Sequence, residues 1–442
     1  MKIKNRWNSR ALAAALALAL LLAGCQAGPG PASQSGQEKP GPGGAAPPSA
    51  TPTSPPVEAK PALRVLQQLD GVSYGSGSEE GFYSICIDSR PNDSTNLLYL
   101  DYASHRQVAL CSNPNCSHMD ESCTSWVAHA GDGVFPLYAG EYLYLIFKGS
   151  EQQGEPACIQ KLGRDGSDAA PLITLEPSET LVKPYVTDEK YLYCNKIAVS
   201  AQRQVLRSIV KIDLESGAQT ELYPATEGMI PSILGAGDGH LIVEEFGDMT
   251  NPAAMECTLY TLSTEGALSG PVAAWNTGRM VRWVAGGTIY LLEKGQATLQ
   301  CVDAVSGEQR QIELEPLKQA GVNQGSVRFV QGVSDLVSLS YEMENEPGRP
   351  HWLLACPSSG QTTGFELAYP TAGGLQHMYI VAELEDRYLI SVGEEAVQQY
   401  AVGADGTPGQ LSGIVSQWAL IRKEDYWNSK SDYTAIELFS FE

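Results

Sequence analysis

The segment Val186-Thr-Asp-Glu-Lys-Tyr-Leu-Tyr193 reads as the end of one strand, a tight polar turn and the start of a second, apolar strand. The same pattern recurs in five other clear copies, which are Tyr138–Tyr144, Gly235–Ile242, Val284–Leu291, Val330–Val337 and Val381–Leu389. Equivalent residues of the six copies, which are Tyr142, Tyr191, His240, Thr288, Leu336 and Tyr388, are 49, 49, 48, 48 and 52 positions apart. A further copy starts near Tyr83 and a last one near Trp418. This period is typical of repeat architectures in which each unit stacks on its neighbours.

A second hairpin follows the first in each unit, and its turn contains glycine. These turns begin with Asp, Ser or Thr and end with Gly, which adopts a positive φ without steric cost. Examples are Lys161–Gly166, Ile212–Gly217, Thr261–Gly266, Val302–Gly307 and Val402–Gly406. Two hairpins make a four-stranded antiparallel blade, so the sequence predicts an all-β chain that forms a single β-propeller. At this period residues 62–442 correspond to about 7.6 units, which favours seven blades, with eight as the alternative.

Ring closure depends on the two ends of this repetitive region. A single blade has two apolar faces, and stacking blades in a closed ring covers both of them. Trp418–Lys423 and Tyr433–Phe441 read as two strands at the C-terminal end, whereas the first unit begins with a weak inner strand. We therefore expect strands from both ends of residues 61–442 to share one blade.

The N-terminal 24 residues have the organisation of a secretory signal peptide. Four positive charges precede Ala11–Gly24, a run of Ala, Leu and Gly that would span only about 21 Å as a helix, less than a bilayer core. The run ends in Leu22-Ala23-Gly24-Cys25, which resembles the bacterial lipobox. The resemblance implies cleavage before Cys25 and acylation of its sulfur, whereas the alternative is an ordinary cleaved signal followed by a chance cysteine.

Residues 25–60 are expected to form a lipidated cysteine and a disordered tether. Gln26–Lys60 contains nine Pro and no aromatic residue, so it cannot bury enough apolar surface to fold. Two or more acyl chains hold a protein stably on a membrane. We therefore expect a lipid-anchored protein on the extracytoplasmic face of the cell membrane.

The charge balance argues against nucleic acids and anionic membrane surfaces as partners. The chain has 29 basic and 51 acidic residues, a net charge of −22. Nucleic-acid binding requires Lys and Arg to neutralise phosphates, so this balance argues against it. It also argues against electrostatic docking to an anionic membrane surface.

Together these features resemble the TolB-like β-propeller lipoproteins of Gram-positive anaerobes, most of which have no assigned activity. Leu110–Cys123 and Ala419–Trp427 are the more distinctive segments of this resemblance, which covers residues 1–442. TolB itself carries a mixed α/β domain before its propeller, and here the tether runs straight into strands. The resemblance therefore implies an anchored propeller and not the role of TolB.

Residues 111–123 form a loop that could hold a metal ion. Cys111, Cys116, His118 and Cys123 follow the spacing C-x4-C-x-H-x4-C. Three thiolates and one imidazole complete a structural zinc shell and leave no open position for a catalytic water. One disulfide with a third, free cysteine is the alternative in an exported protein, and a loop with neither is the third possibility.

No catalytic residues are predicted. The sequence lacks the α/β-hydrolase region that would carry a nucleophilic serine, and it lacks the H-E-x-x-H helix of zinc peptidases. We therefore expect a binding or scaffolding module at the cell envelope, with an unknown protein, peptide or glycan at the propeller mouth. The alternative is an envelope hydrolase acting on glycans or peptides.

The remaining reactive or aromatic side chains are assigned structural roles. Single cysteines in apolar strands are expected to act as small buried hydrophobes: Cys86, Cys158, Cys194, Cys257, Cys301 and Cys356. Scattered histidines are expected in turns or at the surface: His105, His129, His240, His351 and His377. Trp residues are expected to pack between blades, and paired carboxylates such as Glu244-Glu245 to be solvated.

Overall fold

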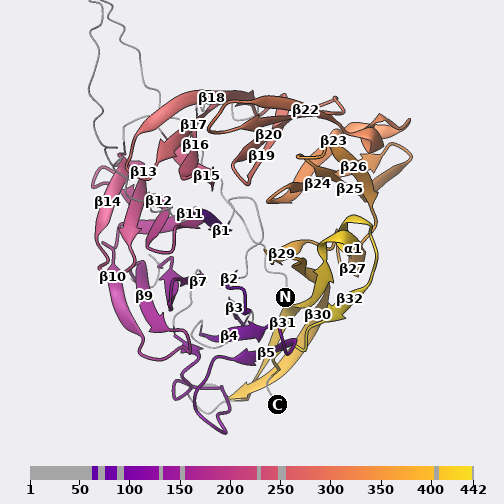
Figure 1. Ribbon diagram of the computed structural model, residues 1–442. Coiled ribbons are helices and arrows are strands. Elements are labelled where there is room, and N and C mark those ends of the chain that lie inside the picture. The colour runs from indigo at the N-terminus through magenta and orange to yellow at the C-terminus, as the bar shows by residue number, and fades with distance from the viewer. Residues whose placement is uncertain are drawn as a thin grey trace, which may run out of the picture. The chain divides into compact units, whose positions relative to one another are not determined.

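The computed structural model describes residues 62–67, 75–86, 94–128, 133–149, 155–225, 230–246, 255–402 and 408–440. This region is almost entirely β-structure and forms seven four-stranded antiparallel blades around a ring, which confirms the favoured blade number (Figure 1). Cys25, the expected signal peptide and the tether lie outside the described residues. No helix in the described part of the chain is long and apolar enough to cross a membrane.

The strands of each blade follow one another from the centre of the ring outward (Figure 1). Blade 1 contains β2 (Gly75–Gly77), β3 (Gly81–Ile85), β4 (Thr95–Asp101) and β5 (Arg106–Ala109). Blade 2 contains β7 (Val134–Ala139), β8 (Tyr142–Phe147), β9 (Cys158–Gly163) and β10 (Ala170–Thr174). Blade 3 contains β11 (Glu179–Thr187), β12 (Tyr191–Val199), β13 (Val205–Asp213) and β14 (Gln219–Tyr223).

The second half of the ring has the same plan. Blade 4 contains β15 (Pro231–Gly237), β16 (His240–Phe246), β17 (Glu256–Ser263) and β18 (Leu268–Asn276), and blade 5 contains β19 (Met280–Ala285), β20 (Thr288–Glu293), β21 (Thr298–Asp303) and β22 (Gln309–Glu313). Blade 6 contains β23 (Val322–Val333), β24 (Leu336–Met343), β25 (Glu346–Cys356) and β26 (Gln361–Phe365), and blade 7 contains β29 (Ile380–Glu383), β30 (Arg387–Val402), β31 (Pro408–Arg422) and β32 (Tyr433–Ala435). Elements outside the blades are β1 (Arg64–Gln67), β6 (Trp126–Val127), η3 (Glu315–Lys318), β27 (Ala368–Thr371), β28 (Gly374–His377) and α1 (Lys423–Trp427).

The predicted turns form by the expected chemistry. Val186 pairs with Tyr193 across the β11–β12 hairpin. In the β13–β14 turn, Asp213 Oδ1 accepts hydrogen bonds from the backbone and hydroxyl of Ser216, and Gly217 has a φ of 74°. The Asp side chain thus replaces backbone partners while Gly adopts the left-handed conformation.

One turn was assigned to the wrong pair of strands. Residues 403–407 lie outside the described residues, but the strands on either side of them, β30 and β31, are the second and third strands of blade 7, and not the third and fourth. These two strands are 16 and 15 residues long, about twice the usual length here. An Asp-Gly turn closes any hairpin, so its composition does not indicate where in a blade that hairpin lies.

Seven clusters of buried apolar side chains coincide with the seven interfaces between adjacent blades. Leu97 and Leu143, for example, share the cluster between blades 1 and 2. The cluster between blades 7 and 1, which we call the closing interface, contains Leu100, Trp418 and Leu420. The ring is therefore closed by side-chain packing of the same kind that joins every other pair of blades.

The prediction that strands from both ends share a blade is wrong. Blades 1 and 7 are each complete within their own segment, and Trp418 belongs to β31 inside blade 7. The N-terminal strand β1 instead pairs with β11 and adds a fifth, innermost strand to blade 3. The Arg64 guanidinium holds it there by donating to the carbonyls of Gly77 and Tyr138 and to the Glu189 carboxylate, each at 2.8 Å.

Candidate metal centre

The Cys/His loop connects the outer strand of blade 1 to the inner strand of blade 2. It begins after β5 and ends at β6, which pairs with the start of β4 through Asn96 and Trp126. The Leu97 amide donates to the Ser125 carbonyl at 2.8 Å, and the Leu110 amide donates to the Leu97 carbonyl at 2.9 Å. Both ends of the loop are therefore fixed on one strand of the blade, which brings distant parts of the loop together.

The four predicted ligands converge in space. One ligand atom from each of Cys111, Cys116, His118 and Cys123 lies within 4.8 Å of all the others. Cys123 is buried, with 4% of its surface exposed, while the other three are half-buried. His118 Nδ1 lies 3.2 Å from Cys123 Sγ. The arrangement supplies a soft donor set that could hold a metal ion.

Polar hydrogens surround the sulfur atoms. The backbone N–H of Asn113 points at Cys111 Sγ, and that of His118 points at Cys116 Sγ, each at 3.4 Å. The Ser125 hydroxyl lies 3.0 Å from Cys123 Sγ, and Asn96 Nδ2 donates to that hydroxyl at 2.8 Å. Donors of this kind stabilise thiolate charge and orient metal ligands.

The loop is also held by contacts among its own polar residues. The Asp120 carboxylate accepts hydrogen bonds from the backbone and hydroxyl of Ser122, and Asn113 Nδ2 donates to the Ser122 carbonyl. Asn115 and His118 adopt φ values of 59° and 58°. These left-handed residues let a 13-residue segment turn tightly enough to direct four side chains inward.

The thiols differ in their tendency to ionise. Burial opposes ionisation of Cys111, but hydrogen bonds from the side chain of Thr124 and the backbone of Asn113 outweigh it and lower its pKa to about 6. Burial raises the pKa of Cys123 to about 11. A cation bound by both sulfurs would favour their thiolate forms and displace the remaining proton.

No disulfide joins the nine cysteines of the described region, including the three in the loop. Cys194, Cys257 and Cys301 are buried in the blades as predicted, whereas Cys86, Cys158 and Cys356 are only partly buried. The loop with four protein ligands is a closed site, because a tetrahedral ion would have no position left for water or substrate.

Two predictions about polar residues are wrong. Glu244 was expected at the surface but is fully buried between blades 4 and 5, where Arg282 and the indole N–H of Trp275 bind it. His377 was expected in a turn or at the surface but is 1% exposed, between Phe365 and Trp352. Neither burial is visible in the sequence, because it depends on how neighbouring blades stack. His129 lies outside the described residues.

Tryptophans mostly pack as predicted, with one difference. Trp283, Trp352 and Trp418 are buried in clusters between blades. Trp427 on α1 is half-exposed and lines a groove of about 540 Å³ on the outer surface. The other lining residues come from blades 5 and 6 and from η3: Glu313, Glu315, Gly360, Gln361, Thr362 and Thr363.

The two carboxylates of this groove share one lysine. Lys318 Nζ lies 3.1 Å from Glu313 and 2.7 Å from Glu315. Hydrogen bonds from Lys318 and Thr298 lower the pKa of Glu313. A carboxyl held in its ionised form cannot donate a proton to a leaving group near neutral pH.

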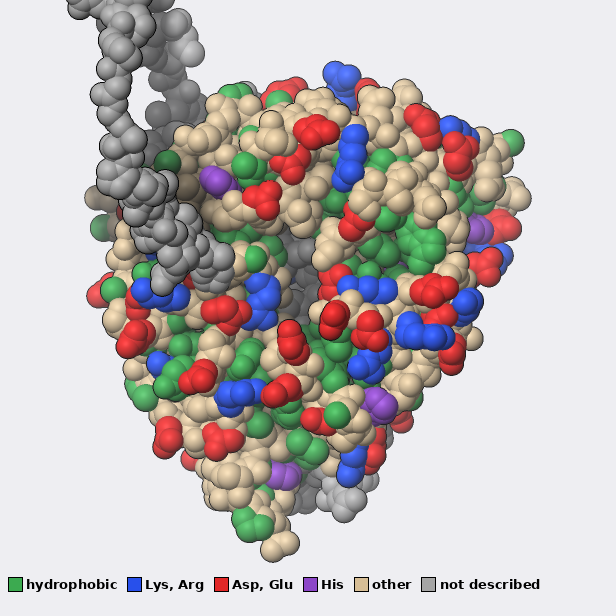
Figure 2. Space-filling view, in the orientation of Figure 1, with side chains coloured by type: hydrophobic (Ala, Val, Ile, Leu, Met, Phe, Trp, Pro, Cys, Tyr) green, Lys and Arg blue, Asp and Glu red, His purple; other side chains and the backbone are tan. Residues whose placement is uncertain are grey.

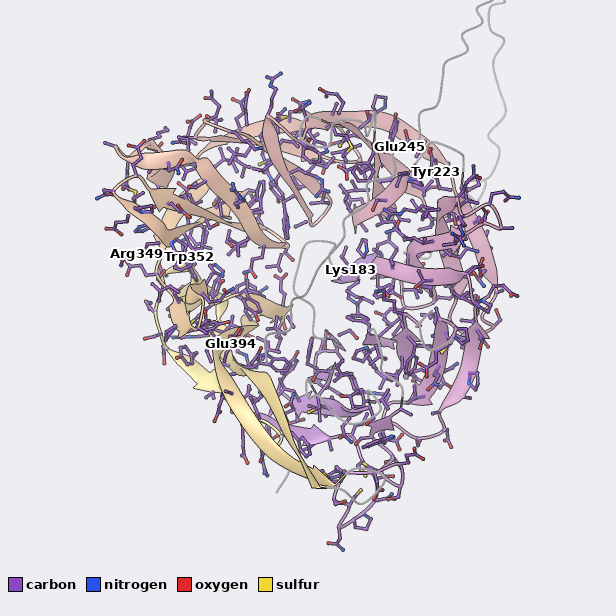
Figure 3. The ribbon with its side chains drawn as sticks, turned by 180° about the vertical axis from the view of Figure 1, so that it is seen from behind. Lys183, Tyr223, Glu245, Arg349, Trp352 and Glu394 are labelled. Carbon is purple, nitrogen blue, oxygen red and sulfur yellow. The ribbon has the colours of Figure 1, made fainter. Side chains whose placement is uncertain are left out.

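The face of the ring seen in Figure 2 shows no gathering of one kind of charge. Figure 2 shows acidic and basic side chains mixed around the central hollow of the face in view. From the other side, Figure 3 shows Tyr223 beside Glu245, Lys183 near the centre, Arg349 and Trp352 on blade 6 and Glu394 on blade 7. These labelled residues are spread around the ring and do not converge on one point.

Comparison with known proteins identifies similar folds at low identity. No protein-family model and no curated protein matches the chain. An oligogalacturonate lyase in complex with manganese aligns with a TM-score of 0.45 and 10% identity, covering 80% of this chain and 90% of that one. The acylaminoacyl peptidase of Pyrococcus horikoshii has a TM-score of 0.45 and 10% identity over 82% of this chain, and dipeptidyl peptidase 4 of Porphyromonas gingivalis has 0.43 and 9% over 81%. The chain spans about half the length of these two peptidases.

Proposed function

We propose that this protein is a cell-envelope lipoprotein, anchored through Cys25, whose propeller is a binding or scaffolding module and whose Cys/His loop holds one structural zinc ion. The lipobox and the 35-residue tether of the sequence support the anchor. The closed propeller and the convergent ligand set support the other two parts.

Zinc is the ion that suits this donor set best. Thiolate and imidazole ligands favour Zn²⁺ over Mg²⁺, Ca²⁺ or Mn²⁺, which prefer oxygen. Zinc binds sulfur at about 2.3 Å and nitrogen at about 2.0–2.1 Å. In a tetrahedral site with these bond lengths, any two ligand atoms lie about 3.5–3.8 Å from each other. The ligand atoms already lie within 4.8 Å of one another, and His118 Nδ1 lies 3.2 Å from Cys123 Sγ, so binding requires only small shifts of these side chains.

The observation that carries the binding role is the groove beside Trp427, in which Lys318 holds the Glu313 carboxylate ionised. In the described part of the chain, each carboxyl whose pKa clearly departs from its ordinary value is lowered. A glycan hydrolase needs one carboxyl with a raised pKa to act as general acid. In the groove, the ionised Glu313 cannot act as that acid, whereas the aromatic surface of Trp427 and several polar groups suit the binding of a glycan.

Metal analysis and thiol counting on anaerobically purified protein test the zinc site. We expect one zinc per chain, its loss in His118→Ala, and its retention in the control His240→Ala. The propeller should remain folded in both variants. Protein without metal and with one disulfide among the three loop cysteines would contradict the site.

Incubation with immobilised cell-wall glycans and peptides tests the binding role. We expect the full chain to be retained on one of these surfaces without shortening it. If the groove is the site, Trp427→Ala should lose retention, whereas Tyr142→Ala, at another exposed aromatic position, should keep it. Release of shortened fragments would favour the hydrolase.

A further inference from the structure

The ring closes without strand exchange, so its closing interface depends on other contacts. Phe82 of blade 1 meets Trp418 of blade 7 edge to face, with ring centroids 5.7 Å apart. Ile436, which follows β32, is buried in the same cluster and donates its amide to the Trp418 carbonyl at 2.9 Å. The chain beyond blade 7 therefore takes part in closure.

Residues 436–439, which we call the closing segment, cross from blade 7 to the outer strand of blade 1. The Glu437 amide donates to the His105 carbonyl at 2.9 Å, and the Gln107 amide donates to the Glu437 carbonyl at 2.8 Å. The carboxylate of Glu437 binds Arg106 at 3.0 Å. The Phe439 amide donates to Gln107 Oε1 at 3.3 Å. These contacts attach the closing segment to β5.

The strand that receives the closing segment leads directly into the Cys/His loop. β5 ends at Ala109, and the first ligand is Cys111. The Phe439 ring meets the His118 ring edge to face, with centroids 5.6 Å apart and planes at 76°. One metal ligand therefore contacts the last described part of the closing segment.

We propose that the Cys/His loop is a metal-dependent latch for the ring, in which an ion fixes the His118 ring as a support for Phe439 and so strengthens the attachment of the closing segment to β5. This inference rests on the proposed metal site and adds a regulatory role to it. Without the ion, the imidazole can rotate and the loop loses its four-way cross-link. The closing segment then keeps its backbone hydrogen bonds but loses the packing that limits their opening.

The test is amide hydrogen exchange on the full chain, first stripped of metal by a chelator and then reloaded with one equivalent of Zn²⁺. We expect zinc to slow exchange of the Gln107 and Glu437 amides at least threefold. Exchange in β17 of blade 4, on the opposite side of the ring from the closing interface, should not change. In Phe439→Ala, the chain should still bind one zinc, but the zinc-dependent slowing at Glu437 should be lost.

Separate readouts distinguish failure of the latch from failure of the metal site. One bound zinc per chain with unchanged exchange at Gln107 and Glu437 would overturn the latch and leave the metal site intact. Absence of zinc binding would overturn both. If Phe439→Ala does not fold, Phe439→Leu retains apolar volume without the aromatic edge and should show a reduced effect of zinc. Equal slowing by zinc in the parent and a folded Phe439 variant would also overturn the latch.

Discussion

Arg282 and Glu244 form a buried two-point ion pair between blades 5 and 4. Arg282 Nε lies 3.0 Å from Glu244 Oε1, and Arg282 Nη2 lies 3.1 Å from Oε2. The Trp275 indole donates to the same carboxylate at 2.6 Å and also lies under the guanidinium, 5.1 Å from its carbon. Glu244 is therefore fully satisfied, which explains how a carboxylate can have no exposed surface.

Glu244→Gln should destabilise the ring strongly, because it leaves the Arg282 charge buried without its partner. Loss of one member of a buried pair typically costs about 3–5 kcal/mol. Arg279→Met in the same region is a matched control, because the pair it forms with Glu293 is largely exposed and should contribute only about 0–1 kcal/mol. Urea unfolding of both variants measures the difference, and a loss below about 1 kcal/mol for Glu244→Gln would contradict this account.

His377 should make the fold sensitive to acid. Burial lowers its pKa to about 3, and neither ring nitrogen has a hydrogen-bond partner in the described structure. The unfolded chain binds a proton near pH 6.5 that the folded chain cannot, so stability is lost as the pH falls from about 6.5 towards 3.

Replacing this histidine should remove that part of the acid sensitivity. At pH 4.5, protonation of His377 in the unfolded chain lowers the free energy of unfolding by about 3 kcal/mol. Between pH 7.5 and 4.5, the parent should therefore lose about 3 kcal/mol more of its free energy of unfolding than His377→Phe does. His240→Phe, at a partly exposed position, is the control. Urea unfolding at the two pH values checks the prediction, and parallel losses in the parent and His377→Phe would show it to be wrong.

Cys25→Ser should prevent acylation and release the protein from the membrane, or leave an unprocessed precursor. The physical reason is that acyl chains supply the only expected anchor, since the mature chain is acidic. Membrane fractionation and mass measurement provide the test. Cys86→Ser controls for the loss of a thiol, and a processed Cys25→Ser protein still held at the membrane would refute the anchor.

Deleting residues 431–442 should unfold the whole ring. The deletion removes β32 and the closing segment, so it exposes the edge of β31 and opens the cluster that contains Trp418 and Ile436. A thermal scan should lose its cooperative transition. Deleting residues 26–58 should leave that transition in place, and an unchanged melting curve for the C-terminal deletion would argue against closure by this segment.

Local chemistry made much of the fold predictable. Turns such as Asp213–Gly217 and the alternation of apolar residues depend on neighbours within a few positions, so their spacing indicated four strands per unit and favoured seven blades. The Cys/His cluster was also predictable, because its four ligands lie within 13 residues of one loop. Asn96 and Phe439 around it were not, since they come from segments outside the loop that no spacing links to the ligands.

By itself, the sequence determined the repeat unit, the tight turns and the composition of the metal-ligating loop. Only the tertiary structure decided that β1 joins blade 3, that each terminal blade is complete, and that residues 436–439 bind β5. It also decided the burial of Glu244 and His377. The physical reason is the sequence separation of the contacts. A turn is stabilised by adjacent residues, whereas the partner of an edge strand or of a buried charge comes from a segment tens to hundreds of residues away. Closure of the ring decides which of these distant segments meet.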